Sequence, residues 1–196
     1  MNYPGGIKHS KSTINKCINY ANRGMSLEEE LNITNNYYRD IDKAIIYKKP
    51  TPIKVVKANF VSRQNAKITE AYFAMPSTTD YNGIYKGKYI DFEAKETTSS
   101  TSFPLTNIHK HQLLHLKKVY EHNGISFIIV RFTHLNETYL LFEKELDEFI
   151  NTNNRKSIPL DYFKEKGYLI KDKFNPRIDY LEVIDNIGGI YNEKRN

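Results

Sequence analysis

Cysteine and long hydrophobic runs are almost absent from this sequence. The 196 residues include a single cysteine, Cys17, which excludes an internal disulfide framework and any zinc site built from paired cysteines. No stretch is long and apolar enough to span a membrane, and the N-terminal residues lack the apolar core of a signal peptide. We therefore expect a cytoplasmic protein in a reducing compartment, with no membrane partner.

Acidic residues are outnumbered by basic ones. The chain has 29 lysines and arginines against 23 aspartates and glutamates, a formal net charge of +6. Such an excess favours a polyanionic partner such as DNA, through phosphate contacts and counterion release. A modest basic excess also occurs in proteins that never bind nucleic acid, so the charge supports this interpretation without establishing it.

Composition divides the chain into two parts. Residues 1–24 are polar, basic and contain glycine, and we expect them to form a flexible arm that orders on DNA. Residues 25–196 have the length of a single domain. Strand-like and helix-like segments alternate there without an internal repeat, which predicts an α/β fold with a mixed sheet flanked by helices.

The most informative pattern is an aspartate followed by Glu-x-Lys on a returning strand. Residues 89–95 alternate polar and apolar residues, as expected of a half-buried strand. The polar face carries Tyr89, Asp91, Glu93 and Lys95. A carboxylate and an ammonium group two residues apart on one face suit a divalent cation and the phosphate that it binds.

Asp80 must reach this strand from the one before it. A turn at residues 82–83 or at residues 86–87 would bring Asp80 beside Glu93. Thr78 would then share the face of Asp80 and offer its hydroxyl or carbonyl oxygen to the metal. The pattern predicts metal-assisted phosphodiester hydrolysis, although a bare Asp…Glu-x-Lys more often marks solvated charges on an exposed strand.

Two helices are predicted near these strands. Ser26 and Glu29 form a capping box at the start of the first, whose apolar stripe runs through Leu27, Leu31, Tyr38 and Ile41. Glu30 leans toward the buried side of this helix, either as a capping or surface charge or as an outer member of the site. The second helix covers residues 106–123.

In the second helix, Gln112 is the only amide on the apolar stripe. It either holds a metal-bound or attacking water or is satisfied structurally. We assign His109, His111 and His115 to the polar surface of the same helix. Further strands are predicted at residues 44–48, 53–57, 125–132 and 139–143, the third of them central, with short helices at residues 145–152, 160–166 and 178–187.

Residues 59–75 interrupt the series of strands. They combine Arg63 and Lys67 with the aromatic residues Phe60, Tyr72 and Phe73, which suits a projection that offers cations to phosphates and rings to exposed bases. The alternative is an ordinary hairpin or helical connection whose aromatic side chains belong to the core.

The sequence resembles the RecU family, the Holliday junction resolvases of Gram-positive bacteria. The resemblance runs from about Gly24 to Tyr191 and is carried by GMSLEEELNITNNYY, KKPTP, EAYF, STTDYNGIYKGKYIDFEAKET, TSFPL and PRIDYLEVI. It implies a restriction-endonuclease-like fold and a homodimer that cleaves four-way DNA junctions during recombination and repair. It also implies Mg²⁺ as cofactor, with Mn²⁺ as a substitute, and modulation of the RecA recombinase in the nucleoid.

The resemblance further implies roles for individual residues. Metal coordination falls to Thr78, Asp80, Glu93 and Gln112, transition-state stabilisation to Lys95, and residues 59–75 become a stalk that protrudes and engages the junction centre. Two alternatives share parts of these features: a restriction-type endonuclease that cuts linear duplex, and a non-catalytic junction-binding regulator of recombination.

Overall fold

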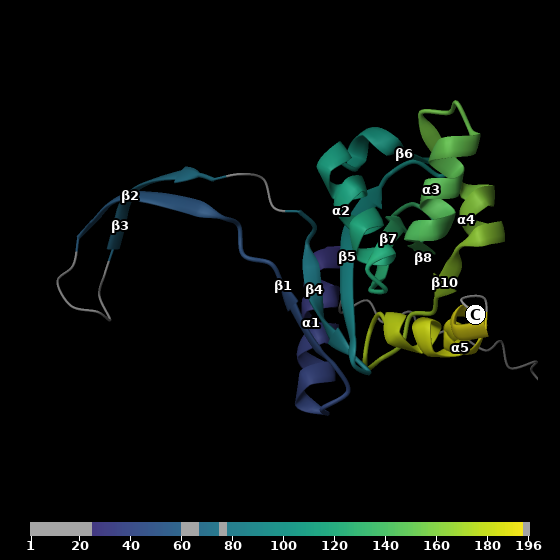
Figure 1. Ribbon diagram of the computed structural model, residues 1–196, viewed down its shortest axis with the longest axis horizontal. Coiled ribbons are helices and arrows are strands. Elements are labelled where there is room, and N and C mark those ends of the chain that lie inside the picture. Colours follow the sequence, from purple (N-terminus) through teal and green to yellow (C-terminus); the bar gives the residue numbers. More distant parts are fainter. Residues whose placement is uncertain (1–24, 60–66, 75–77, 194–196) are drawn as a thin grey trace, which may run out of the picture.

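The computed structural model describes residues 25–59, 67–74 and 78–193. The predicted arm of residues 1–24, as well as Phe60 and Arg63, lies outside these ranges. The body of the domain is built on a six-stranded mixed sheet (Figure 1). Only β5 and β7 run parallel to each other, and the other neighbours are antiparallel. In spatial order the strands are β1 (Ile45–Lys48), β4 (Tyr81–Tyr85), β5 (Lys88–Thr97), β7 (Ile125–Phe132), β8 (Glu137–Phe142) and β10 (Tyr168–Ile170).

Helices cover both faces of this sheet. On one face, α1 (Leu27–Asp40) and α5 (Tyr180–Glu193) enclose a core in which Phe92 stacks on Phe127 and both contact Tyr180. The other face is covered by α2 (Lys110–Glu121), α3 (Glu143–Thr152) and α4 (Leu160–Lys166). Smaller elements complete it: β6 (Ser102–Pro104), β9 (Ser157–Pro159) and the 3₁₀ turn η3 (Leu105–Asn107). The predicted class, a mixed sheet flanked by helices, is confirmed.

A tight turn at Lys86 and Gly87 joins β4 to β5. Both residues have positive φ, 48° and 74°, as a two-residue hairpin turn requires. Of the two turns that the sequence allowed, the structure therefore uses residues 86–87. Gly83 lies within β4, where this strand comes close to β1. A Cβ at this position would lie 2.0 Å from the carbonyl oxygen of Ile45, so only glycine fits without a backbone shift.

A separate hairpin projects from the body of the domain (Figure 1). It consists of β2 (Ile53–Asn59) and β3 (Lys67–Phe73), which pair only with each other in the described part of the chain. Almost every residue of both strands is exposed. This hairpin arm begins at Ile53, earlier than the predicted boundary at residue 59. The two strands predicted at residues 44–48 and 53–57 therefore belong to different sheets, the first to the main sheet and the second to the arm.

Local signals predicted the long elements well. The capping box of Ser26 and Glu29 is present, and β7 is a buried interior strand. The predicted end of the first helical stripe was wrong, because Ile41 follows the helix and is exposed. The second helix begins at Lys110, later than predicted. Within the described ranges, no helix is both long and apolar enough to cross a membrane.

Candidate active site

Asp80, Glu93 and Lys95 meet at the start of β4 and the middle of β5. Asp80 immediately precedes β4, and its Oδ2 accepts a hydrogen bond of 3.1 Å from the backbone N–H of Ala94. This bond places the Asp80 carboxylate beside Glu93, the neighbour of Ala94. Glu93 and Lys95 share one face of β5 and form an ion pair. The hairpin thus assembles two carboxylates and one ammonium group from residues that the sequence predicted.

Glu93 is wholly buried and lacks the hydrogen bonds that buried carboxylates usually have. Among the described residues, neither of its carboxylate oxygens accepts a hydrogen bond of ordinary geometry, although Lys95 forms the ion pair. Burial, together with the neighbouring Asp80 carboxylate, raises the pKa of Glu93 to about 7 against the opposing effect of Lys95. Two acidic groups held this close in a desolvated site favour a bound cation or a shared proton.

The donor chemistry of this site fits a divalent metal ion. The two carboxylates supply hard oxygen ligands, and the oxygens of Glu93 lack hydrogen-bond partners within the described residues, so they can bind a divalent cation. Within the described ranges, no cluster of three or more histidine, cysteine, aspartate or glutamate side chains forms a cage for a metal ion. A cation here would complete its shell with water and substrate oxygens, which is the usual arrangement for Mg²⁺.

Thr78 and Gln112, the other two expected ligands, make different contacts. Thr78 is exposed, and its Oγ1 accepts a 3.0 Å hydrogen bond from the ammonium group of Lys49. Gln112 is buried, but its Oε1 accepts a 2.9 Å hydrogen bond from the backbone N–H of His109 and so closes a capping box at the start of α2. The Gln112 carbonyl oxygen therefore serves the helix in this structure, as one of the two sequence interpretations expected.

Glu30 lies on the opposite face of the sheet from Glu93. Its carboxylate pairs with Arg131 and lies 3.9 Å from Arg177. Along β7, Arg131 lies on the same face as Phe127 and Ile129, which pack in the core beneath α1. Ile128, the register partner of Glu93, lies on the other face, which α2 covers. The structure does not bring Glu30 to the two carboxylates.

Sequence reasoning placed Asp91 on the polar face of β5 but gave it no role. The side chain is wholly buried, and four groups converge on its carboxylate. Lys49 Nζ lies 2.7 Å away, the Tyr89 hydroxyl donates over 2.8 Å, His115 Nε2 is at 3.1 Å, and the Thr79 hydroxyl also donates. His115 is partly exposed on the surface of α2, and its ring also reaches the buried Asp91 carboxylate, a contact that the sequence did not predict. The missing signal was a long-range partner, since Lys49 is far from Asp91 in the sequence.

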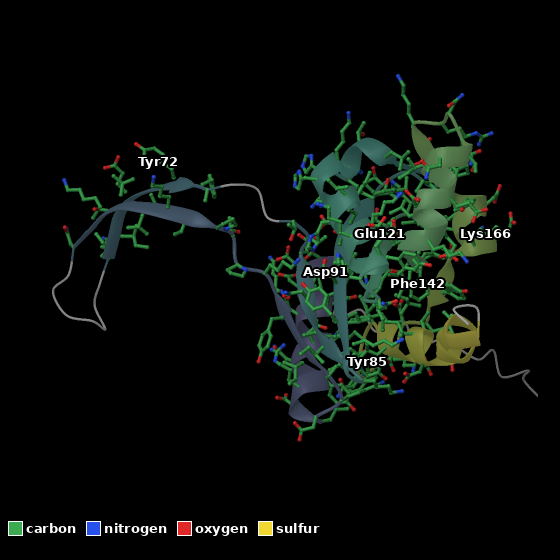
Figure 2. All side chains as sticks on the ribbon, in the orientation of Figure 1. Tyr72, Tyr85, Asp91, Glu121, Phe142 and Lys166 are labelled. Atoms are coloured by element: carbon green, nitrogen blue, oxygen red, sulfur yellow. The ribbon has the colours of Figure 1, made fainter. Side chains whose placement is uncertain are left out.

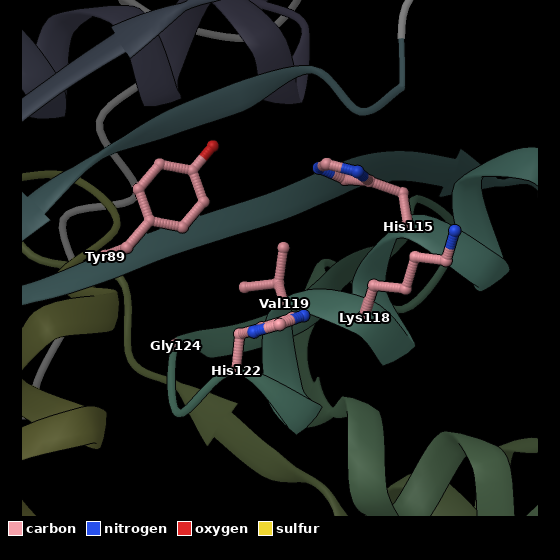
Figure 3. Close-up of a pocket in the computed structure, with 6 residues that line it drawn as sticks. All are labelled: Tyr89, His115, Lys118, Val119, His122 and Gly124. Carbon is pink, nitrogen blue, oxygen red and sulfur yellow. The ribbon is translucent and has the colours of Figure 1, made fainter.

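A small pocket of about 260 Å³ adjoins this cluster (Figure 3). In the close-up, Tyr89 and His115 point toward each other across it, and both hydrogen-bond to Asp91. Its lining is Tyr89, His115, Lys118, Val119, His122 and Gly124. The lining thus includes basic side chains near the Asp91 carboxylate, and Asp91 lies on the same face of β5 as Glu93. Lysine and histidine there can favour an approaching phosphate.

The predicted DNA-contacting residues that the structure describes lie on the hairpin arm. Tyr72 and Phe73 are 60% and 84% exposed, so neither belongs to the core. Lys67, the first residue of β3, is exposed as well. Tyr72 lies on the arm and Asp91 in the body of the domain (Figure 2). The arm therefore offers aromatic and basic side chains to solvent.

Comparisons with known proteins identify the family of this chain. The family described as Recombination protein U matches residues 22–186 of this chain. A protein of Bacillus cereus (strain G9842) named Holliday junction resolvase RecU is 50% identical over 195 residues, covering 95% of this chain and 98% of the relative. A protein of the same name from Geobacillus sp. (strain WCH70) is 50% identical over 193 residues, covering 94% of this chain and 96% of its own. The chain therefore belongs to the RecU family.

Proposed function

We propose that this chain is a Holliday junction resolvase, an endonuclease that hydrolyses phosphodiester bonds in four-way DNA junctions. The observation that carries the proposal is the meeting of Asp80 and Lys95 around the buried Glu93 in a member of the RecU family. Relatives that are half identical over nearly the whole chain carry the resolvase name. A basic chain with exposed cations and rings on a projecting arm is consistent with a DNA substrate.

Each residue of the site has a distinct task in this reaction. Asp80 and Glu93 would hold a divalent cation, for which we propose Mg²⁺ with Mn²⁺ as a substitute. When bound, such a cation polarises the phosphodiester and lowers the pKa of a water molecule. The Ala94 N–H orients the Asp80 carboxylate. The Lys95 ammonium stabilises negative charge as it accumulates on the phosphate oxygens, and the dry surroundings of Glu93 strengthen that interaction.

We extend the proposal to the fold class and to the association of two copies of the chain. The β4–β5 hairpin that carries Asp80, Glu93 and Lys95 on a mixed sheet supports a restriction-endonuclease-like fold. Ile45 and Ile84 are register partners on β1 and β4 and are 58% and 56% exposed. Large exposed apolar side chains on the edge strand β1 and on its neighbour β4 support association with a second copy. A two-fold dimer would present one site to each of two strands and make symmetric cuts.

We propose that the hairpin arm is the stalk of this fold and engages the junction centre. Its exposed Tyr72 and Phe73 suit stacking on bases that a duplex would hide, and Lys67 suits a phosphate. The pair Arg63→Ala and Lys67→Ala should weaken junction binding more than duplex binding at fixed salt, with unchanged melting. Equal losses on both substrates would assign the arm to general DNA affinity. Modulation of RecA stays a prediction of the family resemblance.

The experiment that tests the function compares a labelled four-way junction with its separate duplex arms, with and without Mg²⁺. We expect paired, symmetric cuts in the junction only. Cleavage of linear duplex at a fixed site would favour a restriction-type enzyme, and binding without cleavage would favour a regulator. Asp80→Asn should abolish cutting and keep junction affinity in Ca²⁺, because Asp80 acts in the chemistry. Cutting at the wild-type rate by this variant would refute the site.

A further inference from the structure

Lys49 connects the residues before β4 to the strand that carries Glu93. It follows β1 directly, and its backbone N–H donates a 2.7 Å hydrogen bond to the carbonyl oxygen of Asp80. Its ammonium group donates to the hydroxyl groups of Thr78 and Thr79. One lysine therefore binds all three consecutive residues of the segment 78–80.

The same ammonium group is anchored on Asp91. The Lys49 Nζ to Asp91 Oδ2 distance is 2.7 Å, and the Thr79 hydroxyl donates to the other oxygen of the same carboxylate. Asp91 is wholly buried on the face of β5 that also carries Glu93. A buried charge that is paired and hydrogen-bonded on all sides has a fixed position, and removal of one partner is costly. Asp91 thus provides a rigid point on β5 to which Lys49 ties the segment 78–80.

The lysine also lies at the base of the hairpin arm. The two strands of the arm close where Ala74 N–H donates a 2.9 Å hydrogen bond to the carbonyl oxygen of Pro52. Pro52 is three residues beyond Lys49 in the sequence. The Lys49 side chain is only 14% exposed and is directed into the domain toward Asp91. The Lys49 ammonium group is therefore poorly placed to bind a DNA phosphate directly.

From this arrangement we propose that Lys49, anchored on Asp91, is a positioning residue that holds Asp80 against Glu93, so that both carboxylates bind one cation. This inference rests on the proposed function of Asp80 and Glu93. Groups that orient metal ligands from behind commonly change metal affinity or activity about 10- to 100-fold when they are removed. Lys49 acts on Asp80 through the backbone, because its N–H donates to the Asp80 carbonyl oxygen and its ammonium group holds the two residues before Asp80.

The test compares Lys49→Met with wild type in the full chain. We expect junction affinity in Ca²⁺ within about twofold of wild type, and a single-turnover cleavage rate in Mg²⁺ lower by about tenfold or more. Calorimetric titration with Mn²⁺ in the absence of DNA should show affinity weaker by about tenfold. Lys49→Arg keeps the charge and should recover part of both losses. Lys166→Met, at the end of α4 and far from Asp91 in Figure 2, removes the same charge and should match wild type.

A second variant separates positioning from simple stability. Lys49→Met leaves Asp91 buried without its cation, and Lys49→Met with Asp91→Asn removes that imbalance. We expect the double variant to regain melting temperature while its rate and Mn²⁺ affinity stay low. Recovery of rate together with melting temperature would overturn the proposal, as would wild-type Mn²⁺ affinity in Lys49→Met or a loss confined to junction binding. If wild-type protein does not cleave junctions at all, the proposed function fails, and the Mn²⁺ titration still decides whether Lys49 positions the carboxylates.

Discussion

Replacing Glu93 by glutamine should stabilise the metal-free protein above pH 7 while abolishing cleavage. The wild-type carboxylate is wholly buried beside Asp80 and accepts no ordinary hydrogen bond within the described residues. Its pKa is raised to about 7, first by burial and then by Asp80, from an ordinary value of 4.5. A neutral amide of nearly the same shape avoids the cost of burying a second negative charge, and its NH₂ group can donate to Asp80.

The pH dependence of this effect has a defined sign. Between pH 4.5 and about 7 the folded protein keeps a proton on Glu93 that the unfolded chain has lost, so the free energy of unfolding falls as pH rises. The whole window corresponds to roughly 3 kcal/mol, at about 1.4 kcal/mol per pH unit. Glu93→Gln also loses the ion pair with Lys95, which offsets part of the increase in the free energy of unfolding. We therefore expect Glu93→Gln to be about 1–3 kcal/mol more stable than wild type at pH 8 and nearly equal to it at pH 4.5.

Urea unfolding at pH 4.5 and pH 8, with a chelator present, measures the difference. Added Mg²⁺ should raise the stability of wild type more than that of Glu93→Gln, because a ligand stabilises the state that binds it. A variant less stable than wild type at pH 8, or a difference that is the same at both pH values, would refute the idea that the paired carboxylates are strained without metal. Glu148→Gln on α3 serves as a matched control, because it makes the same substitution at an exposed position.

Two further predictions concern Lys95 and Gly83. Lys95→Ala should lower the single-turnover cleavage rate by about 10²-fold or more with little change in junction affinity, because its ammonium acts on charge that develops in the transition state. A variant that loses affinity but keeps its rate at saturation would make Lys95 a binding residue. Gly83→Ala should lower the free energy of unfolding by roughly 1–3 kcal/mol, measured by urea unfolding, because its Cβ would meet backbone atoms of β1. Wild-type stability would mean that β1 can move away from β4 without cost.

The parts of the fold that the sequence predicted are those with strong local patterns. The alternation of residues 89–95 predicted the two faces of β5, and the capping box at Ser26 predicted the start of α1. Because Asp80, Glu93 and Lys95 lie on one short hairpin, their meeting depends on local turn geometry. Three-residue strands such as β6 and β9 escaped prediction, since each is defined only by its pairing with a distant partner.

The site beyond these three residues depends on contacts that are distant in the sequence. Lys49 reaches Asp91 from the loop after β1, and His115 reaches it from α2. No spacing rule connects these residues, so only the polar face on which Asp91 lies could be predicted from the sequence. The carbonyl oxygen of Gln112 is occupied by the backbone of His109, which the apolar stripe of the helix did not reveal. The role of each of these side chains depends on partners that are distant in the sequence and meet only in the folded structure.

The exposure of the hairpin arm has a consequence for local unfolding. A two-stranded sheet that buries little apolar surface is only marginally stable by itself, so β2 and β3 should open at a far smaller free energy than β5 and β7. Their backbone amide hydrogens should exchange with solvent much faster than those of the main sheet. Opening of the arm beyond the Pro52–Ala74 hydrogen bond leaves the main sheet intact. We therefore expect the twist of the arm to vary without a change in the hairpin that carries the two carboxylates.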